Sequence, residues 1–391
     1  MRVLHVIPSI APCYGGPSRL VLDTCEALRN AGVDAEVATT NADESADLPI
    51  PDELPAMVQG VPVYFFARQN RWRYKFSWNL TNWLKRNVGQ YDLLHIHALF
   101  SYSTAAAAFY ARKFKVPYIM LPHGMLGPWP IRNRRLLKSI YLNAVEKKNL
   151  ARAAAVHFTA EDELRTSVVA GRANFVLPYI VNLGTHAGAR LSSKSDARVR
   201  ILYMSRLDPK KGIELLIQAL GRLVGDLDEF ELVIAGSGDH AYEEQVKAKV
   251  RAHEQLAAVT TFVGFVQGDE KAALLASSDI FVLPSYDENF GIAIAEAMAA
   301  GLAVIVSDRV NIHEAIREAG AGLVVSPTAE SVLAALQKLL SHAALRSEMG
   351  KKGADLVENQ FSPQAITRET VKVYSDVIHN CRESLSWRAA P

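Results

Sequence analysis

The sequence predicts an α/β protein made of two doubly wound parallel-sheet domains in tandem. Short apolar runs typical of buried strands alternate with Leu- and Ala-rich helical patterns along almost the whole chain, which favours βαβ units. A polar stretch interrupts this alternation near the middle, and a length of 391 residues exceeds the usual size of one core. These observations together predict two separate cores.

Six strands are expected on either side of the interruption, at apolar runs bounded by turn residues. On the N-terminal side they lie at residues 3–7, 35–39, 61–66, 92–97, 117–122 and 154–158. On the C-terminal side they lie at residues 200–204, 230–236, 260–265, 280–285, 303–307 and 322–326. The first strand is followed by a helix that is expected to open near Pro17 and to stop at Gly32.

The predicted domain boundaries follow from the polar stretch. Residues 183–197 are rich in Gly and Ser without a sustained period and are expected to form a linker. Residues 1–182 then make the N-terminal domain, and residues 198–372 make the C-terminal domain. The last helical stretch follows the final strand, and its pattern allows it to pack on either domain.

Composition indicates a cytoplasmic protein. Hydrophobic residues make up 49% and charged residues 21%, which is typical of a globular chain in water. Three scattered cysteines fit a reducing compartment and neither a disulfide framework nor a zinc site. No apolar run reaches the length of a membrane span, and the N-terminus does not read as a signal peptide. Peripheral attachment to the inner face of a membrane stays open.

Charge is unevenly distributed along the chain. Residues 1–180 carry 21 Lys and Arg against 14 Asp and Glu, whereas the remainder carries 22 against 27. Much of the basic excess lies in residues 68–86, where cations alternate with aromatic side chains and no acid is present. Two interpretations remain open: a solvated helix face, or a surface for membrane headgroups or an anionic acceptor. Nucleic acid is disfavoured because no recognised binding motif accompanies the stretch.

Two glutamates eight positions apart mark the first candidate site. In the segment YDENFGIAIAEAMAAG (286–301), Glu288 lies in the loop after a strand and Glu296 lies inside the following helix. The first-turn amides near Gly291 are donors for a phosphate, and the small residues around it leave room for one. The two carboxylates can then accept from hydroxyls at either end of a bound diphosphate. The alternative is structural: a helix N-terminal charge for Glu288, and a pairing with a cation elsewhere for Glu296.

Two cations at another strand end suit the same ligand. In MSRLDPKKG (204–212), Arg206 leaves the strand and Lys211 precedes the glycine that opens a helix. Arg makes paired contacts with phosphate oxygens, and Lys acts as a compact charge. Ligands of parallel sheets bind beyond the carboxyl ends of the strands, where these residues lie.

Five further strand ends carry weaker signals. Gly15 and Gly16 precede a helix N-terminus, which favours an anion, although an ordinary turn explains them as well. His123 follows a strand and can donate to a sugar hydroxyl or act as an acid or base, although a structural histidine with satisfied hydrogen bonds explains it as well. His95 and His97 share a strand face, but no third ligand is evident for a metal, and His97 at the strand end can touch an acceptor. Gly236 clears space for a ligand after one strand, although an ordinary turn explains it as well, and residues 263–266 after the next strand, ending at Val266, can receive a flat base.

Together, the ENFGIAIAEAMAAG, SRLDPKKG, HG and GG segments resemble the retaining glycosyltransferases of family 4, which have the GT-B fold. The correspondence covers nearly the whole chain in order. The resemblance implies two Rossmann-like domains that face a central cleft, with an acceptor-binding N-terminal domain and a donor-binding C-terminal domain. It also implies that the final helix, residues 373–391, crosses back to the N-terminal domain. The hinge departs from the family pattern, because the usual Asn-Gly turn is replaced by LPYIVNLG (177–184).

The resemblance assigns roles to single residues. Glu288 contacts the transferred sugar, Glu296 contacts the ribose, and Arg206 and Lys211 bind the diphosphate. Gly16 lies against the phosphates, and His123 reaches the sugar from the opposite domain. The predicted catalytic residues are His123, Arg206, Lys211 and Glu288. The predicted donor-binding residues are Gly15, Gly16, Gly236, Val266, Asn289, Phe290, Gly291, Ile292 and Glu296. His97 is predicted to contact the acceptor.

The expected reaction transfers a hexose, with retention, from a nucleoside-diphosphate sugar to a saccharide or lipid-linked saccharide in polysaccharide biosynthesis. UDP-glucose or a related UDP-hexose is the favoured donor. No cofactor and no metal are expected, because cations and helix amides stabilise the leaving diphosphate. The DLD triplet at residues 226–228 imitates a metal-binding DxD but is expected on the far side of the sheet. The alternatives are a sugar-nucleotide epimerase of the same fold and a catalytically silent saccharide- or lipid-binding protein.

Overall fold

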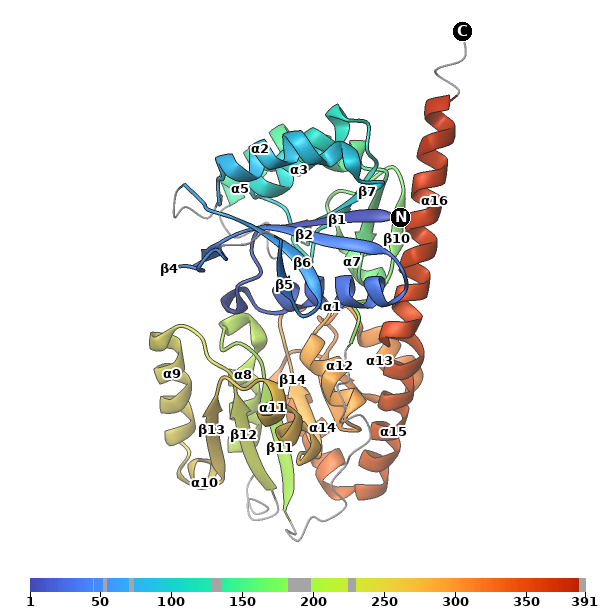
Figure 1. The fold of residues 1–391 in the computed structure, drawn as a ribbon. Helices are drawn as coiled ribbons and strands as arrows, with labels where there is room; N and C mark the ends of the chain where they lie inside the picture. Colours follow the sequence, from blue (N-terminus) through green and yellow to red (C-terminus); the bar gives the residue numbers. More distant parts are fainter. Residues whose placement is uncertain are drawn as a thin grey trace. The chain divides into compact units, whose positions relative to one another are not determined.

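The chain consists of two compact α/β units in a computed structural model that describes residues 1–44, 46–51, 55–69, 74–127, 135–181, 198–223 and 230–386 (Figure 1). Unit 1 comprises Met1–Ile180 together with Pro363–Pro391, and unit 2 comprises Val181–Ser362. The predicted linker at 183–197 and the DLD triplet at 226–228 lie outside the described residues.

Unit 1 is built on an eight-stranded sheet in the order β10-β9-β8-β7-β1-β2-β6-β5. Its strands are β1 Arg2–Ile7, β2 Asp34–Thr40, β5 Ala56–Val58, β6 Val61–Phe66, β7 Leu93–His97, β8 Tyr118–Leu121, β9 Ala155–Phe158 and β10 Asn174–Val176, and a separate hairpin comprises β3 Ala42–Asp43 and β4 Ala46–Asp47. All neighbours in the sheet are parallel except β5, which pairs antiparallel with β6. The sequence does not predict β5 and β10, since three residues carry too little periodicity.

Helices cover both faces of this sheet (Figure 1). They are α1 Gly16–Asn30, α2 Trp78–Asn87, α3 Tyr102–Lys113, α5 Arg135–Tyr141, α6 Lys147–Arg152, α7 Glu161–Thr166 and α16 Pro363–Ser386, with the short turns η1 Pro12–Tyr14, η2 Val88–Gln90 and η3 Leu142–Glu146. On one face α1 packs beside α16, whose Tyr374 and Ile378 enter the core with Leu28. On the other face α2 and α3 contribute Leu84 and Ala107. The last helix is therefore part of unit 1 from its first residue.

Unit 2 is built on a six-stranded parallel sheet in the order β13-β12-β11-β14-β15-β16. Its strands are β11 Val199–Met204, β12 Phe230–Ala235, β13 Thr260–Gly264, β14 Ile280–Leu283, β15 Ala303–Ser307 and β16 Gly322–Val325. Its helices are η5 Pro209–Lys211, α8 Ile213–Gly221, α9 His240–Arg251, α10 Glu254–Ala258, α11 Gly268–Ala276, α12 Ile292–Ala299, α13 His313–Ala319, α14 Ala329–Ser341 and α15 Ala343–Gln360. All six predicted strands are present.

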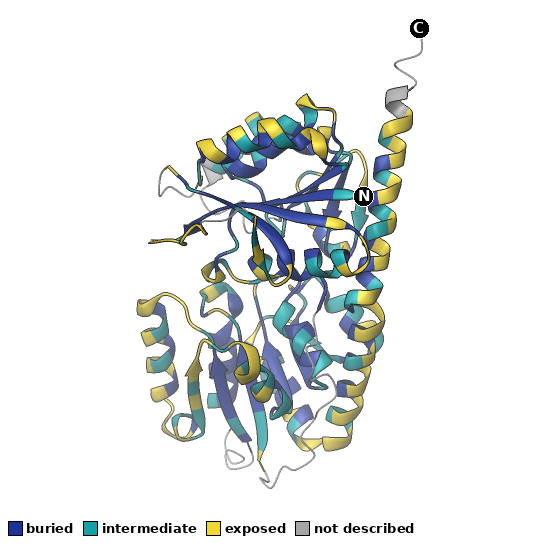
Figure 2. Ribbon diagram, viewed as in Figure 1, coloured by how far each residue is buried: buried dark blue, intermediate teal, exposed yellow. Residues whose placement is uncertain are grey.

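Burial follows the expected pattern of a doubly wound sheet. Most strand residues are buried, whereas the outer faces of the helices are exposed (Figure 2). Strands buried on both faces read as continuous apolar runs, which is why the sequence located them well. Among the described helices, none has an apolar stretch of the length that a bilayer crossing needs.

Candidate active site

Two loops of unit 2 meet at the carboxyl edge of its sheet. Strands β11 and β14 are parallel neighbours, so the chain that leaves β11 lies beside the chain that leaves β14. The amide of Tyr286 donates to the carbonyl of Lys210 at 2.7 Å. Gly212, at φ +69°, allows this approach, because a Cβ on it would lie 2.2 Å from the carbonyl oxygen of Pro284.

The contact between these loops forms an ion pair that the sequence analysis did not foresee. The Nζ of Lys211 contacts Oε2 of Glu288, and the two side chains are only 11% and 14% exposed. Beside them, Lys210 pairs with Asp287 at 3.2 Å. The half-buried pair places one positive and one negative group together, directly at the strand ends where a ligand is expected.

The backbone of Glu288 is held by a third loop, which follows β15. The amide of Glu288 donates to the carbonyl of Arg309 at 3.0 Å, and its own carbonyl accepts from the amide of Asn311 at 3.0 Å. The side-chain amide of Asn311 also donates to Asn289 at 3.2 Å. Residues 309–311 carry no recognised motif, so the sequence alone does not indicate this contact. These bonds fix the direction in which the Glu288 carboxylate leaves the chain.

Helix α12 begins just after Gly291, the residue near which the sequence predicts its first turn. Gly291 adopts a left-handed conformation with φ +75° and caps the helix, so Ile292 is the first helical residue and its amide has no intrahelical acceptor. The side chain of Phe290 is 1% exposed and packs against Phe361 in the core of unit 2. A predicted donor contact of Phe290 can therefore involve its backbone only.

Glu296 lies in the middle of α12 and is paired. Its Oε1 lies 2.5 Å from the Nζ of Lys271 on α11, and the two side chains are 18% and 20% exposed. This pairing with a cation elsewhere is the structural alternative that the sequence left open. Lys271 is a residue that the sequence analysis missed, because nothing in its own segment links it to Glu296.

Arg206 differs from the two lysines. Its side chain is exposed, and within the described residues it takes part in no ion pair. The neighbouring loop after β12 lies tightly against it: a Cβ on Gly236 would lie 1.9 Å from the carbonyl oxygen of Ser205, and one on Gly238 would lie 2.0 Å from that of Leu207. Close packing of the two loops therefore already accounts for Gly236. Val266 is half-buried after β13.

In unit 1, Gly15 and Gly16 stand where a glycine-rich helix start was expected. Gly15 has φ +77° and caps α1, which begins at Gly16 with Pro17 in its first turn. A Cβ on Gly15 would meet nothing within 4 Å, so its conformation and not its surroundings favours glycine there.

His123 lies in a constrained turn after β8. Its φ is +55°, a left-handed value that is uncommon for a residue other than glycine. The buried carboxylate of Glu163 accepts a hydrogen bond from the amide of the next residue, Gly124, at 2.6 Å. Both ring nitrogens are engaged: Nε2 lies 3.2 Å from Nδ1 of His97, and Nδ1 lies 2.5 Å from the hydroxyl of Tyr179. Burial, with a smaller contribution from His157, lowers the pKa of His123 to about 3, so the ring is neutral at pH 7.

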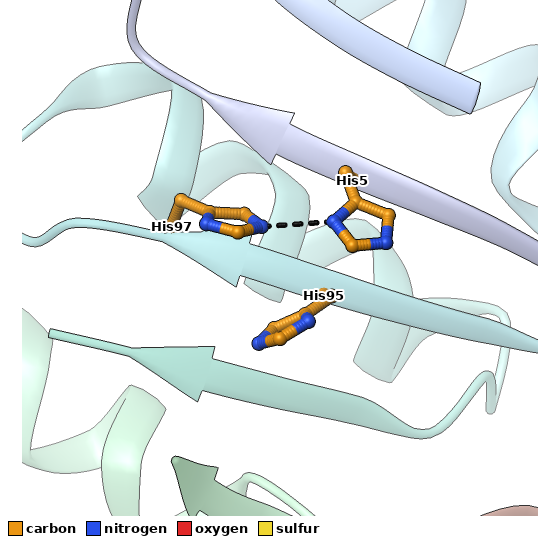
Figure 3. Close-up of side chains that lie close together, drawn as sticks. All are labelled: His5, His95 and His97. Atoms are coloured by element: carbon orange, nitrogen blue, oxygen red, sulfur yellow. Dashed lines mark hydrogen bonds between the residues drawn. The ribbon is translucent and has the colours of Figure 1, made fainter. Parts of the chain in front are cut away.

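His97 is 3% exposed, and its other nitrogen lies 2.9 Å from Nδ1 of His5. The sequence predicts no third potential metal ligand near His95 and His97, and that prediction is wrong. His5 of β1 stands opposite His95 in the parallel register and adds a third ring (Figure 3). A strand pair formed by residues so far apart along the chain leaves no local signal.

Two family models together match most of the chain. Residues 15–179 match the family model described as "Glycosyl transferase 4-like domain", and residues 190–356 match that described as "Glycosyl transferases group 1". A phosphatidyl-myo-inositol mannosyltransferase of Mycolicibacterium smegmatis is 27% identical, over 96% of this chain and 94% of that one. The GDP-mannose:cellobiosyl-diphosphopolyprenol alpha-mannosyltransferase of Komagataeibacter xylinus is 24% identical, over 100% of this chain and 97% of that one.

Among solved structures, Anabaena HepE in complex with UDP-glucose superimposes with a TM-score of 0.74 at 18% identity, over 96% of this chain and 100% of the other. This likeness supports the fold. Because the two family models match the two halves of the chain in order, the chain belongs to the family 4, group 1 glycosyltransferases and has the GT-B fold.

Proposed function

We propose that this glycosyltransferase moves a hexose from a nucleoside-diphosphate hexose to a saccharide or lipid-linked saccharide, with retention of the anomeric configuration. The observation that carries the proposal is the half-buried Lys211–Glu288 pair beside the start of α12. A cation, a carboxylate and a helix N-terminus gathered at one strand end suit a diphosphate with a sugar attached.

In the proposed complex, the diphosphate takes the place of Glu288 as the partner of Lys211. The released carboxylate then accepts hydrogen bonds from hydroxyls of the hexose. Arg206, which is exposed and takes part in no ion pair within the described residues, contributes the second cation. Together with the amides at Gly291 and Ile292, these charges stabilise the diphosphate as the anomeric bond breaks.

The remaining predicted residues enter the proposal with narrower roles. Glu296 is proposed to exchange Lys271 for ribose hydroxyls, and Gly236 and Val266 to border the base. In unit 1, Gly15 and Gly16 are proposed to approach the phosphates, His123 to contact the sugar, and His97 the acceptor. No metal enters the proposed reaction.

Two nucleotide sugars are candidates for the donor, GDP-mannose and UDP-glucose. Both full-length relatives are named as mannosyltransferases, and the name of one states GDP-mannose, which favours GDP-mannose here. UDP-glucose, the donor favoured on the sequence alone, is supported by the similarity to the HepE structure with that ligand. The acceptors named for the two relatives, an inositol phospholipid and a diphosphopolyprenol-linked sugar, support a lipid-linked acceptor.

A donor-hydrolysis and transfer assay tests the proposal. The purified chain is incubated with GDP-mannose, UDP-glucose or ADP-glucose, with and without excess EDTA, and the anomeric configuration of the released or transferred sugar is read by proton NMR. We expect turnover of one hexose donor, an unchanged rate in EDTA and an α-anomer first product. Turnover of none of the three, or an inverted product, contradicts the proposal, and a rate lost in EDTA contradicts metal independence.

A further inference from the structure

A line of buried histidines runs through unit 1 to the turn that carries His123. At its outer end the hydroxyl of Tyr179 lies 2.5 Å from Nδ1 of His123. Nε2 of His123 lies 3.2 Å from Nδ1 of His97, and Nε2 of His97 lies 2.9 Å from Nδ1 of His5. The last of these contacts is drawn in Figure 3. Each ring therefore meets its neighbours through one Nε2 and one Nδ1.

The line continues through a tyrosine of the last helix. The hydroxyl of Tyr374 lies 3.4 Å from Nε2 of His5 and 2.6 Å from Nδ1 of His95. Nε2 of His95 lies 3.4 Å from Nδ1 of His157. Nε2 of His157 lies 2.7 Å from the carbonyl oxygen of Leu177, where the line ends. The five rings and two hydroxyls form what we term the histidine relay.

The carbonyl of Leu177 gives the relay a direction. A carbonyl oxygen can only accept, so His157 must carry its proton on Nε2, and its Nδ1 then accepts from Nε2–H of His95. Tyr374 donates to His95 and accepts from His5. In the same way, each further ring accepts at Nδ1 and therefore has its own proton on Nε2, up to and including His123. The opposite direction would place a buried cation on His157 or bring two lone pairs face to face, and both are costly.

This assignment requires every ring to be neutral, and their surroundings agree. Burial lowers the pKa of His5 to about 3 and that of His157 to about 4. Burial and the neighbouring rings hold the pKa values of His95 and His97 well below the ordinary value. Each neutral imidazole has one donor and one acceptor, and the relay uses both in every ring.

We propose that the Leu177 carbonyl, acting through the histidine relay, fixes His123 as the neutral Nε2–H tautomer. Nδ1 is then the one ring position that His123 can offer to a ligand, as a hydrogen-bond acceptor, and a ligand reaches it by displacing the hydroxyl of Tyr179. His97, His5 and Tyr374 are positioning residues. If His123 contacts the transferred sugar, a step that rests on the proposed function, the sugar hydroxyl donates to it, contrary to the donating histidine that the sequence suggested.

A metal site is the competing use of the same rings. His5, His95 and His97 offer ring nitrogens that all lie within 4.8 Å of one another. A metal between the facing nitrogens of His5 and His97 needs two lone pairs, where the relay places one lone pair and one N–H. The relay and such a metal therefore exclude each other, and one experiment distinguishes them.

Nitrogen-15 NMR of the full chain with labelled histidine tests the assignment directly. At neutral pH, two-bond proton–nitrogen correlations should show His5, His95, His97, His123 and His157 as neutral Nε2–H tautomers, each assigned by loss of its signal in a single variant. A Nδ1–H tautomer or a cation at any of the five overturns the relay. Added Zn²⁺ should leave these signals unchanged, whereas their stoichiometric shift identifies a metal site and also overturns it.

Removal of the Tyr374 hydroxyl, in the middle of the histidine relay, tests whether the Leu177 carbonyl determines the tautomer of His123. In Tyr374→Phe, His5 loses its acceptor, and we expect His123 to lose its uniform Nε2–H state while His157 keeps its own. The control is Tyr118→Phe, which removes a buried hydroxyl that bonds Asn149 outside the relay, and it should change none of the five. An unchanged His123 in Tyr374→Phe overturns the proposal. Should that variant fail to fold, His95→Leu removes both the acceptor of Tyr374 and the donor to His157, and it carries the same expectation for His123.

Kinetics separate this inference from the proposed function. If the wild type transfers a hexose, Tyr374→Phe should lower kcat about tenfold, the value of one hydrogen bond, with the donor KM nearly unchanged. An unchanged kcat despite an altered tautomer removes His123 from the reaction but leaves the relay. A wild type without any transfer refutes the proposed function, and the NMR result still decides on the relay.

Discussion

Two lysine–carboxylate pairs lie at the candidate site, whereas Arg206 takes part in no ion pair among the described residues. Lys211 pairs with Glu288 and Lys271 pairs with Glu296, all four being less than about a quarter exposed, so removal of one partner leaves a half-buried charge uncompensated. Such a pair can also admit an anionic ligand, because the ligand can replace the carboxylate as the partner of the lysine. In the proposed complex, a diphosphate replaces Glu288 as the acceptor of Lys211, so the charge of the lysine stays compensated.

Substitution of Glu288 by glutamine tests the role of its charge. The glutamine amide keeps the shape of the carboxylate but is a weaker acceptor of hydrogen bonds from hydroxyls. We therefore expect Glu288→Gln to lower kcat/KM for hexose transfer about 100-fold, which corresponds to about 2.7 kcal/mol of transition-state stabilisation. Asp287→Asn is the matched control, since it removes the neighbouring carboxylate of the parallel Lys210 pair. An equal loss in both variants would place the effect in the loop and not in Glu288.

At the scale of the elements, glycines decide how closely the site loops approach. Gly212 and Gly301 both adopt left-handed conformations, at φ +69° and +79°. A Cβ on Gly212 would lie 2.2 Å from the Pro284 carbonyl oxygen, whereas one on Gly301 would meet nothing within 4 Å. The first position therefore combines backbone strain with a steric conflict, and the second has the strain alone.

This pair gives a stability prediction with its control built in. Gly301→Ala should cost about 1 kcal/mol of the free energy of unfolding, the usual cost of a left-handed alanine. Gly212→Ala should cost about 2 kcal/mol more, because the loops after β11 and β14 must separate, and it should also weaken nucleotide binding. Urea unfolding followed by circular dichroism measures both. Equal costs would show that the close approach contributes nothing.

Elements were predictable where the pattern is local. Strands such as β11 and β15 are buried on both faces and appear as short apolar runs, and the α12 segment carries its glycine and small residues in sequence. Contacts between distant segments were not predictable. Lys211 and Glu288 are 77 positions apart, and His5 and His97 are 92 apart. Their meeting depends on strand order and register, which periodicity does not specify.

For the whole molecule, the basic excess lies in the N-terminal part, which also exposes large apolar side chains. Trp78 of α2 and Phe109 of α3 are 58% and 53% exposed, and residues 1–180 carry the basic excess. Aromatic side chains beside cations suit a headgroup region that contains anionic lipid. We therefore propose that the protein binds such a surface peripherally while it reaches a lipid-linked acceptor.

Vesicle co-sedimentation tests this surface. The full chain should sediment with phosphatidylglycerol-containing vesicles at low ionic strength. It should be released at about 0.5 M salt, because screening reduces the range of the electrostatic attraction. Trp78→Ala should reduce the bound fraction, whereas Tyr286→Ala, at an exposed aromatic of unit 2, should not. Equal binding to vesicles of neutral phosphatidylcholine would contradict an electrostatic contribution.

Acid should weaken the whole molecule through the histidine relay. Burial depresses the folded-state pKa values of His5 and His123 to about 3 from an ordinary value of 6.5. The unfolded chain therefore binds protons that the folded chain does not, so stability is fully present above pH 6.5 and falls as the pH decreases towards 3. Melting temperatures between pH 8 and 4 measure the slope. His157→Gln should flatten it, while His240→Gln, at an exposed histidine, should leave it unchanged.

Binding of a diphosphate where the loops after β11 and β14 meet is tested most directly by calorimetric titration of GDP and of UDP. The titrations use the full chain and two lysine variants. Lys211→Ala should weaken the bound nucleotide at least about tenfold, whereas Lys210→Ala, one residue earlier in the same turn, should change its affinity less than about threefold. Equal affinities for wild type and Lys211→Ala would contradict the assignment of the diphosphate to this site.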